Sequence, residues 1–232
     1  MISFVCCYNN YDAMIVMRSS LVKLQDYELI VVDNTSNRFM SASSALNHGF
    51  NMSCGDIMIF LHQDIIVPSA DDIREIAGFL NANPNSIVGV AGIKNRIGAH
   101  VISSMYDPTH PAGYRTLSGP QEVFTVDECF VALSRDTFKA IGQFDEVNFD
   151  GWHMYVADLC MTGKRYKVDT YVLPTSIIHM SKGKADVTWW KYMEIARQKH
   201  SSNFGMIRTT CGWMFTNNIL NMILSFYRSC RR

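Results

Sequence analysis

The stretch IMIFLHQD, residues 57–64, decides the fold class of this chain. Its first five residues are apolar and are followed at once by His62, Gln63 and Asp64, which predicts a buried strand with polar groups at its carboxyl end. Similar apolar runs predict further strands at residues 2–7, 28–32 and 87–90. Amphipathic segments predict helices at residues 12–24, 40–52 and 71–80. This alternation predicts an α/β fold with a Rossmann-like, mainly parallel central sheet flanked by helices.

The later part of the chain is less regular. Residues 94–125 are rich in Gly, Pro, His, Ser and Tyr and are interpreted as a substrate-side loop. Helices are expected at residues 135–141, after the cap Ser134, and at residues 153–162, ended by Gly163. A strand at 166–173 and two C-terminal helices, at 186–199 and 218–229, complete the prediction.

These elements predict one domain over residues 1–232. We expect a nucleotide-binding half at residues 1–93, an α/β acceptor and catalytic half at 94–183, and a helical C-terminal segment at 184–232. A length of 232 residues suits one such unit.

Charge and cysteine content restrict the partners and the location. Lysine plus arginine and aspartate plus glutamate each number 21, so the formal net charge is zero and no global field favours nucleic acid. Seven widely spaced cysteines without a CxxC pair are typical of reduced thiols in a cytosolic protein. No basic signal region and no apolar stretch of about 18 residues is present. We expect a cytoplasmic protein, with at most peripheral association at the inner face of the membrane through its basic C-terminal end.

Polar residues follow four predicted strands and indicate a ligand pocket. The strand ends read FVCCYNN, VVDNTSN, IFLHQD and IIHMSKG, and ligands of open parallel sheets bind at such ends. The chain has neither GxGxxG nor GxxxxGK[ST], which argues against a dehydrogenase or a P-loop ATPase. A diphosphate without a glycine cradle needs a cation, and Asp64 and His179 are the candidate ligands. A mixed oxygen and imidazole site favours Mn²⁺ more than an all-oxygen site does.

Taken together, these segments resemble a nucleotide-sugar glycosyltransferase of the GT-A fold, within the glycosyltransferase family 2 group. The resemblance covers residues 2–183. It is carried by ISFVCCYNN, ELIVVDNTSN, NHGFNMSCGDIMIFLHQD, FVALSRDTFKAIGQFDE, FDGWHMYVADLC and IIHMSKG, in that order. Each piece alone is weak, and the order and spacing make the combination specific.

The resemblance implies a donor site. Tyr8 and Asn10 would line the nucleotide cleft, and Asp33 would accept a hydrogen bond from the imide of uracil or thymine, which favours UDP or dTDP. Asp64 stands at the last aspartate of the family's DxD motif, and His179 resembles a late histidine that completes the metal site. The implied donor-binding residues are therefore Tyr8, Asn10, Asp33, His62 and Lys182. The implied metal-binding residues are Asp64 and His179. His62 departs from the family, since it replaces the first aspartate of DxD.

The resemblance also implies a carboxylate general base near residue 153. Val156 stands where an acid is expected, so the first choice is Asp158, with Asp150 and His153 as rivals. Asp127, Glu128 and Trp152 are the implied acceptor contacts. A structural reading stays open for Asp158, as a capping or solvent-facing acid, and for both histidines, 153 and 179.

The implied function is a metal-dependent transfer of a sugar from a nucleoside-diphosphate donor to a hydroxyl of a glycan or lipid-linked glycan, with inversion, as in polysaccharide biosynthesis. Mn²⁺ or Mg²⁺ would be the cofactor, and a homo-oligomer stays open. One alternative is a non-catalytic nucleotide- or glycan-binding module. A nucleotidyltransferase is disfavoured because CCYNNYDAM is not a glycine-rich basic loop.

Overall fold

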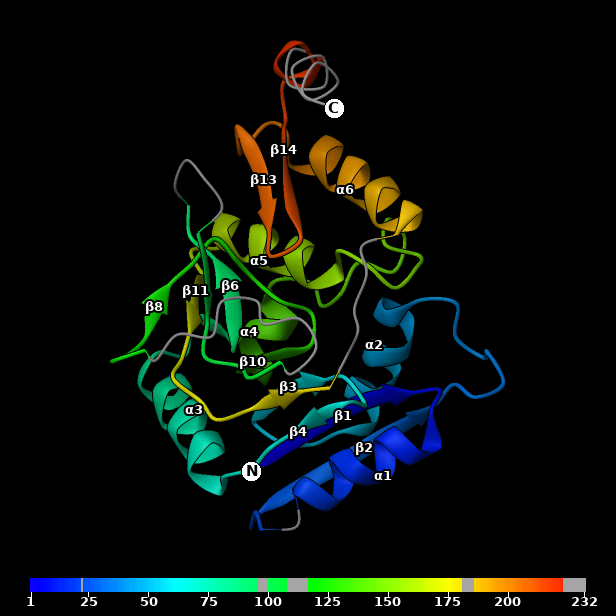
Figure 1. The fold of residues 1–232 in the computed structure, drawn as a ribbon, viewed down its shortest axis with the longest axis vertical. Coiled ribbons are helices and arrows are strands. Elements are labelled where there is room, and N and C mark those ends of the chain that lie inside the picture. The colour runs from blue at the N-terminus through cyan, green and yellow to red at the C-terminus, as the bar shows by residue number, and fades with distance from the viewer. Residues whose placement is uncertain (22, 96–99, 108–116, 181–185, 223–232) are drawn as a thin grey trace.

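A seven-stranded sheet forms the centre of the protein, which we describe from a computed structural model (Figure 1). The structure describes residues 1–21, 23–95, 100–107, 117–180 and 186–222. The strand order is β2-β1-β3-β10-β5-β11-β8. The strands span Ile2–Tyr8 (β1), Tyr27–Asp33 (β2), Ile57–Leu61 (β3), Ser86–Gly89 (β5), Gln121–Glu122 (β8), Phe130–Ser134 (β10) and Asp169–Val172 (β11). All run in one direction except β10 and β8, so the predicted mainly parallel sheet is confirmed.

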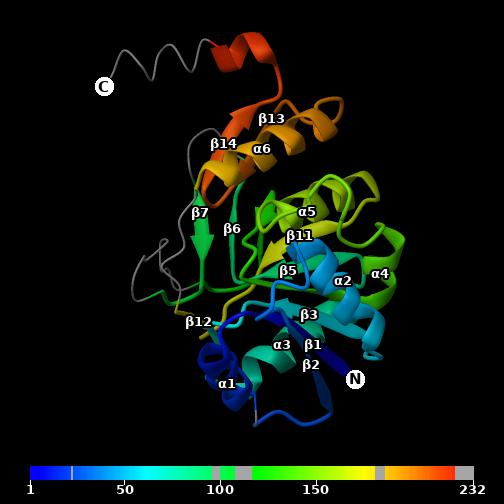
Figure 2. The same ribbon diagram turned by 90° about the vertical axis from the view of Figure 1, so that its right-hand side faces the viewer.

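Helices cover both faces of this sheet (Figure 2). They span Tyr11–Ser20 (α1), Ala42–Met52 (α2), Ala70–Ala82 (α3), Arg135–Ala140 (α4), Tyr155–Arg165 (α5) and Val187–His200 (α6). Side chains alternate along each strand, so Phe4 packs on the face with α1 and α3, whereas Val5 packs on the face with α2, α4 and α5. Two hydrophobic clusters, one on each face, therefore hold the layers together.

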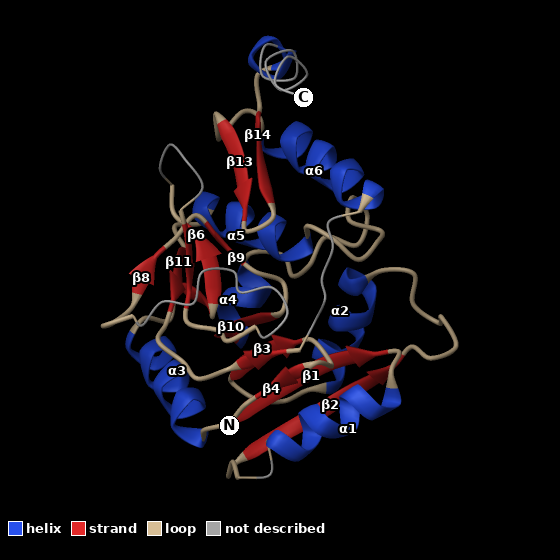
Figure 3. Cartoon of the chain, viewed as in Figure 1, coloured by secondary structure: helices blue, strands red, loops and turns tan. Residues whose placement is uncertain are grey.

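Short strands extend the fold beyond the central sheet. They are Ile65–Ile66 (β4), Ala91–Ile93 (β6), Val101–Ser103 (β7), Thr125–Val126 (β9), Ile178–His179 (β12), Met206–Thr209 (β13) and Gly212–Phe215 (β14). β12 pairs with β4, and β6 lies between β7 and β9. The β13–β14 hairpin stands beside α6 at the end of the molecule opposite α1 (Figures 1 and 3).

Several element boundaries differ from the sequence prediction. The predicted helix at 12–24 ends at Ser20, and the segment 94–125 contains β7 and β8 in addition to loop. Gly163 lies inside α5 and does not end it. Its lack of a side chain allows close packing, since a Cβ there would lie 3.2 Å from Ile87 Cδ1. The helix ends instead in a Schellman motif, in which Lys167 has a φ of 60° and the Val168 N–H donates to the Gly163 carbonyl.

The C-terminal segment also differs from the predicted helical segment, because β13 and β14 lie between its two expected helices. Of the predicted helix at 218–229, residues 223–229 lie outside the described residues. The boundaries at residues 93 and 183 stay a prediction. Among the described residues, no helix combines the length and apolarity needed to span a membrane.

Candidate active site

A cavity of about 210 Å³ opens where β1, β2 and β3 end. One wall comes from the residues that end β1 and β2, and the opposite wall comes from the β9–β10 connection and the start of α5. The residues between these walls belong to β3 and to the turn after it. The lining residues are Cys7, Tyr8, Asn9, Asn34, Ala42, Leu46, Phe60, Leu61, His62, Gln63, Asp64, Glu128, Trp152 and Tyr155.

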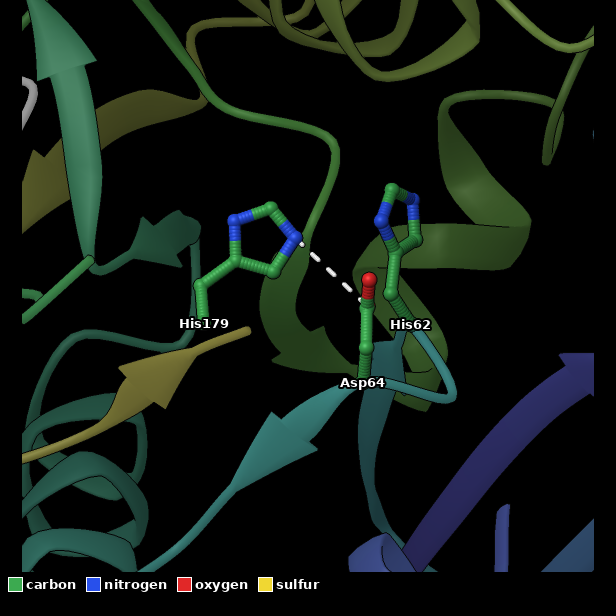
Figure 4. A group of neighbouring side chains, drawn as sticks. All are labelled: His62, Asp64 and His179. Atoms are coloured by element: carbon green, nitrogen blue, oxygen red, sulfur yellow. Dashed lines mark ion pairs between the residues drawn. The ribbon is translucent and has the colours of Figure 1, made fainter. Parts of the chain in front are cut away.

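Three side chains next to this cavity point toward one another (Figure 4). His62 and Asp64 belong to the turn between β3 and β4, and His179 reaches them because β12 pairs with β4. One ligand atom from each lies within 4.8 Å of the others, and the Asp64 Oδ1 to His179 Nε2 distance is 3.5 Å. The predicted association of Asp64 with His179 is therefore present in the structure. His62, expected on the donor, lies in the same group.

Backbone contacts hold this turn in place. The His62 N–H donates to the Cys129 carbonyl at 2.9 Å, and the Met180 N–H donates to the Asp64 carbonyl at 3.0 Å. Gln63 Oε1 accepts from the N–H groups of Asn9 and Asn10, which fixes the turn to the end of β1. The three side chains are thus presented by a rigid part of the fold.

The group meets the chemical requirements of a cation site. Asp64 Oδ1 and His179 Nε2 are buried and have no hydrogen-bond partner among the described residues, an arrangement that costs free energy unless a ligand pairs them. His179 Nδ1 lies 3.8 Å from Asp107 Oδ2, and a carboxylate behind a histidine orients the ring of a metal ligand. One carboxylate and two imidazoles fit a divalent transition metal.

The surroundings also set the protonation of these three residues. Burial lowers the pKa of His62, which favours the neutral form that binds metals. Burial alone would raise the pKa of Asp64 and lower that of His179. Their mutual attraction outweighs burial in both cases, so that the pKa of Asp64 is lowered and the pKa of His179 is raised.

On the wall formed by β1 and β2, Tyr8 lines the cavity as predicted, whereas Asp33 and Asn10 do not. Asp33 Oδ1 accepts from the Thr35 N–H and hydroxyl at 2.8 and 2.7 Å, and these bonds, with one from Tyr8, lower its pKa. Asn10 caps α1 by accepting from the Ala13 N–H at 3.1 Å.

The sequence interpretation missed three polar residues that do line this part of the cavity: Asn9, Asn34 and Gln63. Each is the neighbour in sequence of a predicted site residue. The donor-binding roles of Asn10 and Asp33 stay predictions.

The opposite wall contains Glu128, Trp152 and Tyr155. The Tyr155 hydroxyl lies 3.2 Å from His62 Nε2 and 3.3 Å from the Glu128 carbonyl oxygen, which joins this wall to the metal-ligand group. Burial, with the nearby Asp127 charge, raises the pKa of Glu128 well above its ordinary value. Asp127 points elsewhere: its oxygens accept from the Cys129 N–H at 3.1 Å and the Thr210 hydroxyl at 2.6 Å.

Comparison with known proteins identifies the family. Residues 3–200 match the model of the Glycosyltransferase like family, which is most of the chain. The chain belongs to this family. The predictions of a family 2-like glycosyltransferase and of a GT-A fold are confirmed. No curated protein matches the chain.

Solved structures with the same fold are distant in sequence. A crystal structure of GalNAc-T7 with UDP, GalNAc and Mn²⁺ superposes with a TM-score of 0.63 at 11% identity, over 85% of this chain and 48% of that one. Residues 1–349 of S. aureus TarS in complex with UDP-GlcNAc give a TM-score of 0.58 at 14% identity, over 85% of this chain and 66% of that one. The chain thus spans about half of the GalNAc-T7 chain and just under two thirds of the TarS fragment.

In this glycosyltransferase-like chain, the three predicted bases lie away from the cavity lining. Asp158 is 2% exposed and bonds to Lys199 and His200 at 2.8 and 2.7 Å. Asp150 accepts from the Tyr192 hydroxyl at 2.8 Å, and His153 Nε2 lies 3.5 Å from Asp186 Oδ1. Their catalytic roles stay predictions that these contacts do not support.

Two other predicted residues complete the comparison. Trp152 lines the cavity and is 44% exposed, so its indole remains accessible to a ligand. Lys182, predicted to reach a phosphate, lies outside the described residues.

Proposed function

We propose that this chain is a metal-dependent glycosyltransferase that moves a sugar from a nucleoside diphosphate to an acceptor hydroxyl, with inversion. The observation that carries the proposal is the group His62, Asp64 and His179 beside the cavity. Two of its buried ligand atoms have no hydrogen-bond partner among the residues that the structure describes. A cation bound there would supply Lewis-acid stabilisation to the diphosphate that leaves.

The chain's own residues divide the remaining work. Tyr8, Asn9 and Asn34 line the wall on which we place the nucleotide, and Gln63 anchors the metal-binding turn to that wall. Glu128 and Trp152 line the wall on which we place the acceptor. Sugar transfer then occurs between the two walls, next to the metal ligands.

The donor is proposed to carry a uracil or thymine base, with UDP first. GalNAc-T7 and TarS were crystallised with UDP or a UDP-sugar, which supports UDP, and GalNAc-T7 also with Mn²⁺. Two imidazoles in the ligand group favour Mn²⁺ over Mg²⁺. We further propose a glycan or lipid-linked glycan as acceptor and a cytoplasmic location, at the inner face of the membrane if the acceptor is lipid-linked.

Calorimetric binding tests this proposal without knowledge of the acceptor. UDP, dTDP, GDP and CMP are titrated into the protein with Mn²⁺, with Mg²⁺ and with chelator. We expect UDP or dTDP to bind with Mn²⁺, and the Asp64→Ala variant to bind at least 10- to 100-fold more weakly because a metal ligand is lost. Asp136→Ala, which removes an exposed acid in the first turn of α4, serves as the matched control. Binding that is indifferent to metal and to Asp64 contradicts the proposal.

A binding module without turnover is the second candidate. It is favoured by Val156, which is fully buried and leaves no acid at the position where the family resemblance places one. Metal-dependent UDP binding without release of UDP from any UDP-sugar would support this candidate.

A further inference from the structure

Among the described residues that line the cavity, α5 contributes Tyr155 and no acid, although Asp158 lies in its first turn. Val156 is fully buried in the core, and Tyr155 presents a phenol to the cavity. Met154, the N-cap residue, has a φ of 69° and makes no side-chain capping bond. A carboxylate that lines the cavity near this helix start must therefore come from another segment.

Glu128 supplies a carboxylate from the neighbouring β9–β10 connection. It lines the cavity together with Tyr155, and the backbone N–H of Met154 favours its charged form. The amide end of a helix attracts negative charge, so this contact uses the same feature that an acid on the helix itself would use. Glu128 thus supplies a carboxylate beside the start of α5 from a different segment.

The other acids near the site are committed elsewhere. Among the described residues that line the cavity, the carboxylates are Asp64 and Glu128, and Asp64 belongs to the metal-ligand group. Both oxygens of Asp127 accept hydrogen bonds from the protein. Asp158 is enclosed by Lys199 and His200. Glu128 is left as the carboxylate that lines the cavity on the wall opposite the nucleotide.

We propose that Glu128 is the general base of the transfer reaction, which rests on the function proposed above. Its carboxylate takes the proton from the acceptor hydroxyl while the acceptor oxygen bonds to the anomeric carbon. The bond from that carbon to the diphosphate breaks, and its electron pair leaves with the nucleoside diphosphate. Burial raises the pKa of Glu128, so its carboxylate is a stronger base than that of an exposed glutamate.

The test compares Glu128→Gln with wild type in two assays. The first is UDP binding with Mn²⁺ by calorimetry, and the second is UDP release from UDP-GlcNAc, UDP-GalNAc, UDP-glucose and UDP-galactose, with water or simple glycosides as acceptor. We expect UDP affinity within about threefold of wild type and UDP release slowed about 10²- to 10⁴-fold, the usual contribution of a general base. Glu75→Gln, the same change at an exposed position of α3, is expected to match wild type in both assays.

A rescue experiment separates chemistry from structural damage. In Glu128→Ala, added formate is expected to restore part of the UDP release, because a small carboxylate fits the space left by the side chain. Wild-type release rates in Glu128→Gln, or equal loss of binding and release, overturn the assignment of Glu128 alone. Wild-type protein that binds no UDP with either metal overturns the proposed function itself.

Discussion

Two groups of acidic and histidine side chains in this molecule have similar composition and opposite surroundings. In the metal-ligand group, Asp64 Oδ1 and His179 Nε2 are buried beside a cavity and have no hydrogen-bond partner in the described part of the chain. In the second group, which we call the Lys199 cluster (Asp145, Asp158, Lys199 and His200), each oxygen of Asp158 has a partner. The Lys199 cluster also holds a buried atom without a partner among the described residues, His200 Nδ1, but that atom does not border the cavity. The difference teaches that a carboxylate oxygen without a hydrogen bond beside a cavity, more than residue types, distinguishes a ligand site from a structural ion pair.

The largest expected effect is on stability, in the Lys199 cluster. Asp158→Asn removes the charge that pairs with Lys199 and His200, and breaking a buried ion pair costs about 3–5 kcal/mol of unfolding free energy. Asp64→Asn in metal-free protein is expected to cost about 1 kcal/mol, because Asp64 Oδ1 has a single ion-pair partner, His179 Nε2 at 3.5 Å, and accepts no hydrogen bond from the described residues. Urea denaturation of both variants checks the difference. The reverse order of the two effects would remove the distinction between the groups.

Acid titration probes the same cluster with a smaller effect. Burial alone would raise the pKa of Asp145, but Lys199 and Asn148 outweigh it and lower the pKa to about 2, from 3.8. A lowered folded-state pKa stabilises the fold above pH 4, and this stabilisation is lost as the pH falls toward 2. It amounts to about 2 kcal/mol. The unfolding free energies of wild type and Asp145→Asn, measured at pH 5.5, 3.5 and 2, should therefore differ less as the pH falls. A gap that is constant with pH contradicts this.

The smallest effect concerns Asp127, whose two oxygens are satisfied like those of Asp158. Thr210→Val removes the 2.6 Å hydrogen bond from the hairpin to Asp127 and should cost about 1 kcal/mol of unfolding free energy. The affinity of Thr210→Val for UDP with Mn²⁺ should stay within about twofold of the wild-type affinity. Thr216→Val, which loses a bond to the Phe204 carbonyl and touches no acid, is the matched control. A large loss of UDP affinity in Thr210→Val alone would move Asp127 into the ligand-binding group.

The sequence predicted the parts of the site that depend on strand periodicity. Residues 57–61 form β3 as expected because a short apolar run between polar residues has few other ways to be buried on both faces. The end of β3 then places Asp64 near His179, which the family resemblance had joined to it. His179 lies near Asp64 because β12 pairs antiparallel with β4, which follows the turn after β3. The metal-binding roles of both residues stay predictions.

The side-chain placements that the sequence did not reveal depend on contacts between distant segments. The sequence of α5 does not indicate that Lys199 and His200, about 40 residues later, enclose Asp158. Asp127 and Glu128 are adjacent in sequence, and only the backbone path between β9 and β10 decides which of them faces the cavity. Asp33 and Asn34 show the same ambiguity at the end of β2.

The β13–β14 hairpin lies beyond residue 200, where the match to the family model stops. It is nevertheless hydrogen-bonded to β9 and to the β9–β10 connection, since the Thr125 hydroxyl donates to the Arg208 carbonyl at 2.8 Å and the Thr210 hydroxyl donates to Asp127. For chimeras between relatives, the exchangeable module is therefore not the family-matched stretch alone. A crossover placed after residue 216 keeps both hydrogen bonds within one parent sequence. A crossover at residue 200 instead takes the hairpin and the β9–β10 connection from different parents.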